Sequence, residues 1–468
     1  MVIDMFIGRE KELLALAKHY DSEDFAFIPI YGRRRIGKTQ LIEEFCKNKK
    51  TIFFTAVEGS FAQNMVILSR AIFDSDKAPI FDDFGDALNE IAKMAQKEKI
   101  VFVIDEYPYL AQSQNSVSSI LQQAIDHKFL KTNMLLILSG SSMSFMENQV
   151  LGYQSPLYGR RSGQIKLLPE TFAVSREYAP KFSKEGQAIM FGVSGGIPKY
   201  LSLFNDKMTL DDNLRSQFFD KNSFLFEETD NLLKQELREP AFYKSIITAI
   251  ATGASQMKDI VGKTGSDSGV CSMYLKPLLE LGIVKREVPI MDKPQSKKSI
   301  YRIADGMFRF WYRFVYQNVS LINLDKGEVV YKRTKDQIPA FMGEVFERIC
   351  MEYMWHIYDK LPFAMQDIGR WWGNDPIKRG QSEIDFIAHD DTRKKAIFGE
   401  CKWRNEKVPA SDIDELMDKA RMFAFEEKHY YFFSKSGFND AAKKKANERI
   451  VLVDFRDMFF SSGDMRQQ

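Results

Sequence analysis

Residues 32–39 read Gly-Arg-Arg-Arg-Ile-Gly-Lys-Thr and match the pattern G-x-x-x-x-G-K-T. Residues 25–31 before this stretch form a short apolar run of strand type, and residues 38–47 after it have the composition of a helix. In such a strand, loop and helix, glycines let backbone N–H groups surround phosphate oxygens at the start of the helix. Gly32, Gly37, Lys38 and Thr39 therefore predict a nucleotide-binding loop, with Lys38 on the β and γ phosphates and Thr39 on Mg²⁺. The adjacent Gln40 is a further candidate nucleotide contact.

A second apolar run supplies the acids that such a site requires. Residues 100–104 are continuously apolar, as expected of a central parallel strand, and end at Asp105 and Glu106. We expect Asp105 to hold Mg²⁺ through water and Glu106 to orient or deprotonate the attacking water. The run 134–138 ends in Ser-Gly-Ser-Ser, in which Ser139 is a candidate sensor of the γ-phosphate. A serine-rich turn without that role is the alternative.

These motifs resemble the STAND branch of the AAA+ ATPases, and in particular the archaeal-type ATPase family, which is also found in bacteria. Residues 6–10, with Gly8 and Arg9, resemble the opening motif that packs near adenine, and residues 195–198, with Pro198, resemble the G-x-P signature of the helical lid. The resemblance implies a switch in which ATP and ADP bind between an α/β core and the lid, and the lid position reports which nucleotide is present.

Residues 158–161 resemble the arginine-bearing stretch of the same family. Arg160 is the first candidate for reaching the γ-phosphate and Arg161 is the second. A surface salt bridge is the alternative for either side chain.

The middle of the chain has the pattern of a winged helix-turn-helix. Helical spacing covers residues 241–251, 256–261 and 266–282, and strand-like runs at 283–288 and 299–303 flank a Pro- and Lys-rich loop. Lys293, Lys297 and Lys298 in this loop would meet DNA phosphates. The alternative is a packing module without a DNA-binding role.

Aromatic residues within 306–330 favour a docking helix over a base-stacking platform.

A second set of acids lies near the C-terminal end. Residues 340–358 form an amphipathic helix, and two strands follow at 383–388 and 396–403. Asp385, Glu400 and Lys402 on these strands resemble the site of the PD-(D/E)xK nuclease superfamily, although Ile384 replaces the proline that can precede the aspartate. The resemblance implies that Asp385 and Glu400 are Mg²⁺ ligands and that Lys402 positions a water. Glu347 on the helix is the candidate fourth member, and Glu344 is its less favoured substitute. The alternative is a domain that keeps this fold and only binds.

Length and composition predict several domains. The chain has 468 residues, which is longer than a single hydrophobic core usually serves. Its net charge is +2, and 44% of its residues are hydrophobic. We expect a cytoplasmic protein without a membrane segment, because no apolar stretch approaches the length needed to cross a bilayer. The four cysteines are isolated from one another, which argues against a disulfide scaffold. The predicted fold is a multi-domain α/β chain: a P-loop AAA+/STAND core (1–170), a helical lid (171–235), a winged helix with an aromatic connector (236–330) and a restriction-endonuclease-like domain (331–468).

The predicted function is an ATPase, with ATP and Mg²⁺ as cofactors, coupled through a DNA-binding winged helix to a metal-dependent DNA endonuclease. The alternative is a regulatory switch that binds DNA or protein and carries an inactive nuclease-like domain. A homo-oligomer is left open, because AAA+ relatives form rings whereas STAND proteins can rest as monomers.

Overall fold

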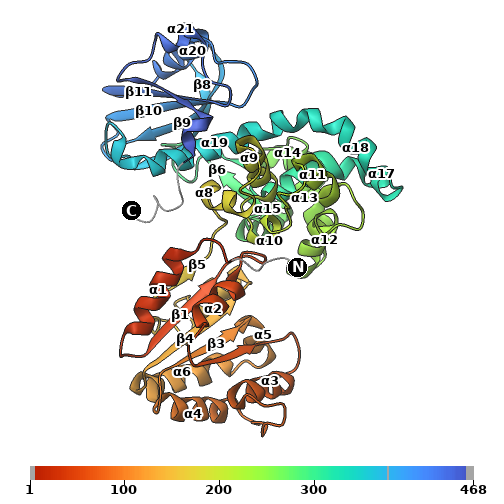
Figure 1. Ribbon diagram of the computed structural model, residues 1–468, viewed down its shortest axis with the longest axis vertical. Coiled ribbons are helices and arrows are strands. Elements are labelled where there is room, and N and C mark those ends of the chain that lie inside the picture. Colours follow the sequence, from red (N-terminus) through yellow and green to blue (C-terminus); the bar gives the residue numbers. More distant parts are fainter. Residues whose placement is uncertain (1–5, 377–378, 460–468) are drawn as a thin grey trace. The chain divides into compact units, whose positions relative to one another are not determined.

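The computed structural model describes residues 6–376 and 379–459 (Figure 1). The chain divides into two compact units, which are described separately. The first comprises Met1–Pro169 with Ile197–Lys199, and the second comprises Glu170–Gly196 with Tyr200–Gln468. No helix within the described ranges is long and apolar enough to cross a bilayer.

The first unit is built on a parallel sheet with the strand order β2-β3-β4-β1-β5. The strands are β1 (Ala26–Tyr31), β2 (Thr51–Thr55), β3 (Ile100–Asp105), β4 (Met134–Gly140) and β5 (Ile165–Lys166). Every residue of β1, β3 and β4 is buried, which explains their continuous apolar sequences. Because the strands are parallel, their carboxyl ends lie at one edge of the sheet, where ligands of open α/β sheets bind.

Helices cover both faces of this sheet (Figure 1). One group packs against the core that contains Phe27, Phe54 and Phe102, and consists of α3 (Phe61–Phe73), α4 (Phe84–Ala95), α5 (Tyr107–Ser113) and α6 (Val117–His127). The helices α1 (Glu10–Asp21) and α2 (Lys38–Cys46) pack against each other, and α1 also contacts β1 and β4. The sheet is thus sealed from water except at its edges.

The second unit begins with a helical region. Its helices are α8 (Phe172–Ser175), α9 (Lys184–Ser194), α11 (Leu210–Phe218) and α12 (Phe224–Glu236), and α10 (Pro198–Leu201) lies where the chain passes between the units. Three helices and an antiparallel hairpin follow in the predicted order: α13 (Pro240–Ala251), α14 (Met257–Thr264), α15 (Ser268–Glu280), β6 (Val284–Glu287) and β7 (Ile300–Ile303).

The aromatic segment after the hairpin forms part of the core. It comprises α16 (Gly306–Phe310), a π-helical turn over Trp311–Val315, α17 (Val319–Asn323) and α18 (Gly327–Thr334). Phe310 lies with its ring centroid 4.5 Å from that of Phe218 in α11, and the indole of Trp311 donates a hydrogen bond to the Phe226 carbonyl (2.8 Å). All five aromatic side chains between Phe308 and Phe314 are buried, as the docking interpretation predicts.

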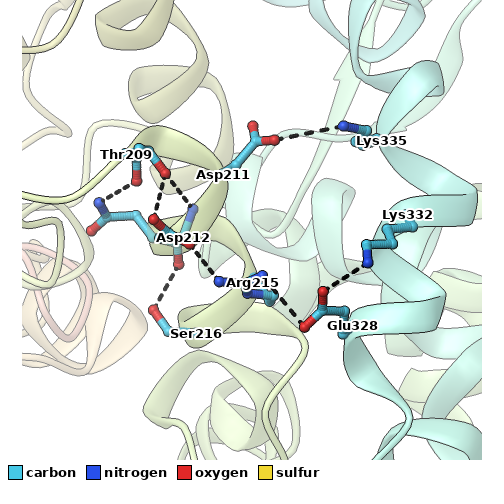
Figure 2. Close-up of polar contacts among 9 residues, drawn as sticks. Thr209, Asp211, Asp212, Arg215, Ser216, Glu328, Lys332 and Lys335 are labelled. Atoms are coloured by element: carbon cyan, nitrogen blue, oxygen red, sulfur yellow. Dashed lines mark hydrogen bonds and ion pairs between the residues drawn. The ribbon is translucent and has the colours of Figure 1, made fainter.

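Polar contacts also link α11 to α18 (Figure 2). Arg215 pairs with Asp212 on its own helix and with Glu328 on α18, while Asp211 pairs with Lys335 just beyond α18. These side chains are well exposed, and exposed ion pairs contribute about 0–1 kcal/mol. The buried ring contact between Phe219, just after α11, and Tyr331 of α18 (centroids 5.4 Å apart) therefore contributes more to this packing than the ion pairs do.

The C-terminal part of the second unit is a mixed sheet with the order β12-β11-β10-β9-β8. Its strands are β8 (Asp367–Asp375), β9 (Gly380–His389), β10 (Lys395–Lys402), β11 (Glu427–Ser434) and β12 (Ile450–Asp454). Strands β8 to β10 are antiparallel, and β10 to β12 are parallel. Figure 1 shows α20 (Ala410–Ala420) and α21 (Asp440–Lys443) on one side of this sheet and α19 (Ile338–His356) on the other.

Strand β8 differs from the prediction, which placed a turn region before β9. Its glycines, Gly369 and Gly373, and its polar residues interrupt the apolar alternation, although Ile368, Trp371 and Trp372 are residues that favour strands. Helix α20 ends at Ala420, and residues 421–426 connect it to β11.

Gly399 is required by close packing between β9 and β10. It lies opposite Phe386 in the antiparallel ladder, and an added Cβ would lie 2.1 Å from the phenyl ring. We expect Gly399→Ala to destabilise the protein by about 1–3 kcal/mol, as overpacking of a core does. Thermal unfolding of the full chain would measure this effect.

Gly343→Ala in α19 is the matched control, because an added Cβ there meets no atom within 4 Å. This change should raise helix stability by about 1 kcal/mol. Equal unfolding midpoints for the two variants would contradict the packing described for Gly399.

Candidate functional site

The glycine-rich loop occupies the carboxyl end of β1, as the sequence predicts. Gly37 has a φ of +88°, and an added Cβ at Gly32 would lie 2.7 Å from the Leu167 carbonyl oxygen. Lys38 is buried, and its ammonium donates to the carbonyl oxygens of Gly32 (3.0 Å) and Arg33 (3.3 Å). The loop thus holds a cationic group beside backbone turns that suit phosphate oxygens.

The two acidic residues at the end of β3, Asp105 and Glu106, meet the helix after the loop and the end of β4. Thr39 Oγ1 donates to Asp105 Oδ2 (2.9 Å), so the two oxygens lie side by side. Glu106 has a φ of +52°, and its carboxylate accepts hydrogen bonds from the backbone N–H (3.2 Å) and hydroxyl (2.8 Å) of Ser141. This left-handed backbone conformation is uncommon for a non-glycine residue and occurs often at functional sites.

Other predicted nucleotide residues surround the same loop. The Arg9 guanidinium donates to the carbonyl oxygens of Leu168 (2.7 Å) and Ile36 (3.4 Å), and Gly8 precedes it with a φ of +74°. Pro198 and Gln40 both lie within 4 Å of the position that a Cβ on Gly37 would occupy. The structure therefore brings Gly8, Arg9, Gln40 and Pro198 to the phosphate loop.

Ser139 and Arg160 are placed differently from their predicted roles. The Ser139 side chain is fully buried within β4, whereas Ser141, the first residue beyond that strand, contacts Glu106. Arg160 forms a bidentate ion pair with Asp126 (2.7 Å for each bond) and donates to the Pro156 and Tyr158 carbonyls, none of which belongs to the loop.

Arg161 donates to the Leu151 carbonyl (3.4 Å). The salt-bridge alternative therefore describes Arg160 in this conformation. In the sequence, Ser139 and Ser141 belong to the same serine-rich stretch. Their environments differ because β4 ends at Gly140, between the two residues.

The second site lies where β9 and β10 diverge. The ladder pairs Phe386 with Gly399, so Asp385 and Glu400 are the next residues on the two strands. Asp385 Oδ2 accepts a hydrogen bond from the Cys401 N–H (2.7 Å), and the Lys402 ammonium forms an ion pair with Glu400. Burial, followed by the charges of Glu400 and Glu347, raises the pKa of Asp385. The three predicted strand residues are thus brought together.

The predicted fourth acid, Glu347, has an ionic partner of its own. Arg370 of β8 lies with its Nε 2.9 Å from the Glu347 carboxylate, and it also approaches Glu287 of β6 (3.7 Å) and Glu383 of β9 (3.9 Å). Burial raises the pKa of Glu347 to about 7, although the charge of Arg370 opposes this shift. Sequence reasoning missed Arg370 because it lies on the strand that was not predicted.

Divalent metal fits the two sites to different degrees. Thr39 and Asp105 present adjacent hard oxygens, and nucleotide phosphates would complete a magnesium shell there. Asp385 and Glu400 offer two neighbouring carboxylates. Across residues 6–376 and 379–459, however, no three Asp, Glu, His or Cys side chains form a group able to hold a metal ion. The residues present therefore fit a cation held by two carboxylates together with water or substrate oxygens, and Glu347 does not join them in this conformation.

Glu344, the less favoured substitute for Glu347, is part of an ionic cluster. Its carboxylate pairs with Arg309 (2.8 Å) and Arg302 (3.5 Å). Burial alone would raise its pKa, but these arginines outweigh burial and lower the pKa to about 2. Glu344 therefore serves the packing of α19 against α16 and β7.

The low pKa of Glu344 predicts a pH-dependent stability. A carboxyl with a folded pKa of about 2 and an unfolded pKa of 4.5 contributes about 3 kcal/mol above pH 4.5, and this contribution is lost as pH falls toward 2. We expect Glu344→Gln to lower the unfolding midpoint equally at pH 7 and pH 5, and less at pH 3.5. The exposed Glu98→Gln is the control, and a difference independent of pH would contradict the assigned pKa.

Family comparisons agree with the two sites. A model described as an ATPase domain predominantly from Archaea matches residues 6–204, and a restriction endonuclease model matches residues 372–459. A third model, of archaeal and bacterial proteins of unknown function, matches residues 311–413. The fold and the sites therefore define a P-loop ATPase joined to a restriction-endonuclease-like domain.

A full-length relative places the chain in a family. This chain is 35% identical over 463 residues to the uncharacterized protein MJECL04 of Methanocaldococcus jannaschii. The alignment spans 97% of this chain and all of that protein. A 48-residue segment is 46% identical to the uncharacterized ATP-binding protein MJ0423 of the same organism and covers 10% of this chain and 81% of that protein. The chain belongs to the archaeal-type ATPase family that carries a C-terminal nuclease-like domain.

Solved structures show more distant similarity. The Walker-type ATPase PABY2304 of Pyrococcus abyssi is 17% identical, with a TM-score of 0.49, and the match covers 66% of this chain and 96% of that chain. The ORC2 protein of Aeropyrum pernix is 11% identical, with a TM-score of 0.42 and coverage of 72% and 97%.

Proposed function

We propose that this protein is a STAND-type AAA+ ATPase that controls Mg²⁺-dependent cleavage of DNA by its C-terminal domain. The observation that carries the proposal is that one chain contains two sites suited to phosphate chemistry. The first site consists of Lys38, Thr39, Asp105 and Glu106, and the second consists of Asp385, Glu400 and Lys402. The first suits phosphoryl transfer to water, and the second suits attack of water on a phosphodiester. We also propose the domain limits 1–170, 171–235, 236–330 and 331–468.

In the proposed ATPase reaction, Lys38 exchanges its loop carbonyl partners for phosphate oxygens. Thr39 and Asp105 would hold a magnesium ion, which would supply neutralising charge at the β and γ phosphates. Glu106 orients the attacking water and accepts its proton once its carboxylate leaves Ser141. Arg160 would have to leave Asp126 before it could contact the γ-phosphate.

In the proposed nuclease reaction, Lys402 is the group that positions water. Burial lowers the pKa of its ammonium, but Glu400 and then Asp385 outweigh burial and raise it, so the side chain carries a proton at neutral pH. A divalent cation bound by Asp385 and Glu400 would supply Lewis acidity at the scissile phosphate. Lys402 would then hold the attacking water and stabilise the developing negative charge.

The region α13–β7 is proposed to be a winged helix that binds DNA. Its supporting feature is the succession of three helices and an antiparallel hairpin. The exposed face of α15 carries Ser272, Met273 and Lys276, which is a weakly basic surface. Most of the DNA affinity would therefore come from phosphate contacts by other basic residues.

A regulatory switch with an inactive nuclease-like domain is the second candidate. The ion pair between Arg370 and Glu347 favours it, because this pair removes the third acid from the metal site. In this candidate, the domain binds DNA or protein and ATP turnover only resets the conformation.

The test is an assay of wild-type protein for ATP turnover and for cleavage of supercoiled plasmid and single-stranded DNA in Mg²⁺ or Mn²⁺. ATP turnover together with metal-dependent cleavage supports the proposal. ATP turnover without cleavage of either substrate in either metal selects the regulatory switch instead.

A further inference from the structure

The loop between β6 and β7 is anchored on strand β8 of the nuclease-like sheet. Ile290 in this loop donates its backbone N–H to the Arg370 carbonyl (2.8 Å), and its side chain is buried in the same core as Trp371 and Ile384. The Trp372 indole N–H donates to the Lys298 carbonyl (3.1 Å). The loop is thus held at both ends and is not a free wing.

This anchorage places the hairpin close to the proposed nuclease site. In the ladder between β8 and β9, Trp371 lies opposite Ile384, and Ile384 directly precedes Asp385. A ligand bound by the hairpin would therefore lie close to β9, the strand that carries Asp385.

A pocket of about 510 Å³ lies between the start of α14 and the hairpin. Three basic side chains line it: Lys258 from α14, Arg286 from β6 and Lys297 from the loop. Gln256, Ser299 and Tyr301 add polar groups, and no acidic residue lines the pocket. The pocket is therefore a concave surface with a local excess of positive charge.

The basic residues of this pocket differ from the other bases of the hairpin. Lys285 pairs with Glu287, Lys298 pairs with Asp292, and Arg302 pairs with Glu287 and Glu344. In contrast, Lys258, Arg286 and Lys297 form no ion pair with any residue in the described ranges, and the contact found for Arg286 is a hydrogen bond to the Pro294 carbonyl (2.9 Å). Three uncompensated cations that converge on one pocket attract an anion with several oxygens.

We propose that this pocket binds a backbone phosphate of duplex DNA and so holds the duplex beside the nuclease strands. The proposal rests on the proposed DNA-cleaving function. Lys258, Arg286 and Lys297 are all exposed, as suits an extended polyanion that passes over the surface. Gln256, Ser299 and Tyr301 provide neutral donors to the phosphate oxygens.

The test measures binding of a fluorescent 30-base-pair duplex to full-length Lys258→Glu and Lys297→Glu variants by anisotropy at several salt concentrations. Each change should weaken binding about 10-fold, and removal of a phosphate contact should lower the slope of log affinity against log salt by about 0.9. Lys263→Glu is the matched control, because this exposed lysine lies in α14, like Lys258, but outside the pocket. Cleavage should show a raised KM for DNA with kcat retained, and ATP turnover should be unchanged.

Four outcomes would overturn the inference. If wild-type protein binds and cleaves the duplex while the pocket variants bind DNA as tightly as Lys263→Glu, the pocket is not the phosphate site and the proposed function stands. Loss of ATP affinity in the pocket variants would identify a nucleotide site instead, and competition by inorganic phosphate at low millimolar concentration would identify a site for free phosphate. Absence of duplex binding by the wild type would remove both the inference and the DNA-binding part of the proposed function.

Discussion

Replacing Lys38 with alanine is expected to lower ATP hydrolysis by about 10²–10³-fold, the range found when one preorganised charge-stabilising group is removed. The buried Lys38 ammonium lies against the loop carbonyls of Gly32 and Arg33, at the start of the helix where phosphates would bind. Alanine leaves the loop without the cation that we propose neutralises the γ-phosphate in the transition state. A steady-state assay of phosphate release would measure the loss.

Glu106→Gln is the informative comparison for Lys38→Ala. It preserves the size of the side chain and a hydrogen-bond acceptor for Ser141, but it removes the carboxylate that we propose accepts a proton from water. We expect ATP binding close to that of the wild type, with slow hydrolysis. Undiminished turnover in Lys38→Ala would refute the nucleotide-site assignment, whereas loss of ATP binding in Glu106→Gln would mean that Glu106 has another role.

Asp385→Asn and Lys402→Ala are expected to abolish DNA cleavage while ATP turnover continues. Asparagine removes one of the two neighbouring carboxylates, and alanine removes the ammonium that pairs with Glu400. Loss of a charge-stabilising group costs about 10²–10³-fold, which would bring cleavage to the background of a plasmid assay.

Lys395→Ala is the matched control for Lys402→Ala. Lys395 lies at the other end of β10 and pairs with Glu427 on the neighbouring strand, so its loss removes a lysine from the same strand without changing the site. Cleavage by Lys402→Ala at the rate of Lys395→Ala would assign the activity to another part of the protein or to a contaminant.

The nucleotide loop could be predicted from sequence because its chemistry is local. The motif fixes Lys38 and Thr39 at the start of α2, and a buried parallel strand can only deliver Asp105 and Glu106 to the same edge of the sheet. The C-terminal strand residues were predictable for a similar reason, since alternation along β10 sets Glu400 and Lys402 on one face. The ATPase core and the nuclease-like domain are accordingly confirmed.

The remaining features depend on contacts between segments distant in sequence. Ser139 and Ser141 differ only because β4 ends at Gly140, which leaves Ser139 inside the sheet and frees Ser141 for Glu106. The partner of Glu347 could not be foreseen, because Arg370 lies on a strand with weak alternation. The loop between β6 and β7 was predicted as a wing, but its sequence does not show that Ile290 belongs to the core of another sheet.

We propose that nucleotide state controls DNA cleavage by this protein. The most direct measurement is the cleavage rate of supercoiled plasmid in Mg²⁺ by wild-type protein with ATP, a non-hydrolysable ATP analogue, ADP or no nucleotide, alongside Lys38→Ala with ATP. We expect the wild-type rate to differ between nucleotide states and Lys38→Ala with ATP to behave as the wild type without nucleotide. Equal cleavage in every nucleotide state and in Lys38→Ala, or no cleavage in any state while ATP turnover is normal, would contradict this proposal.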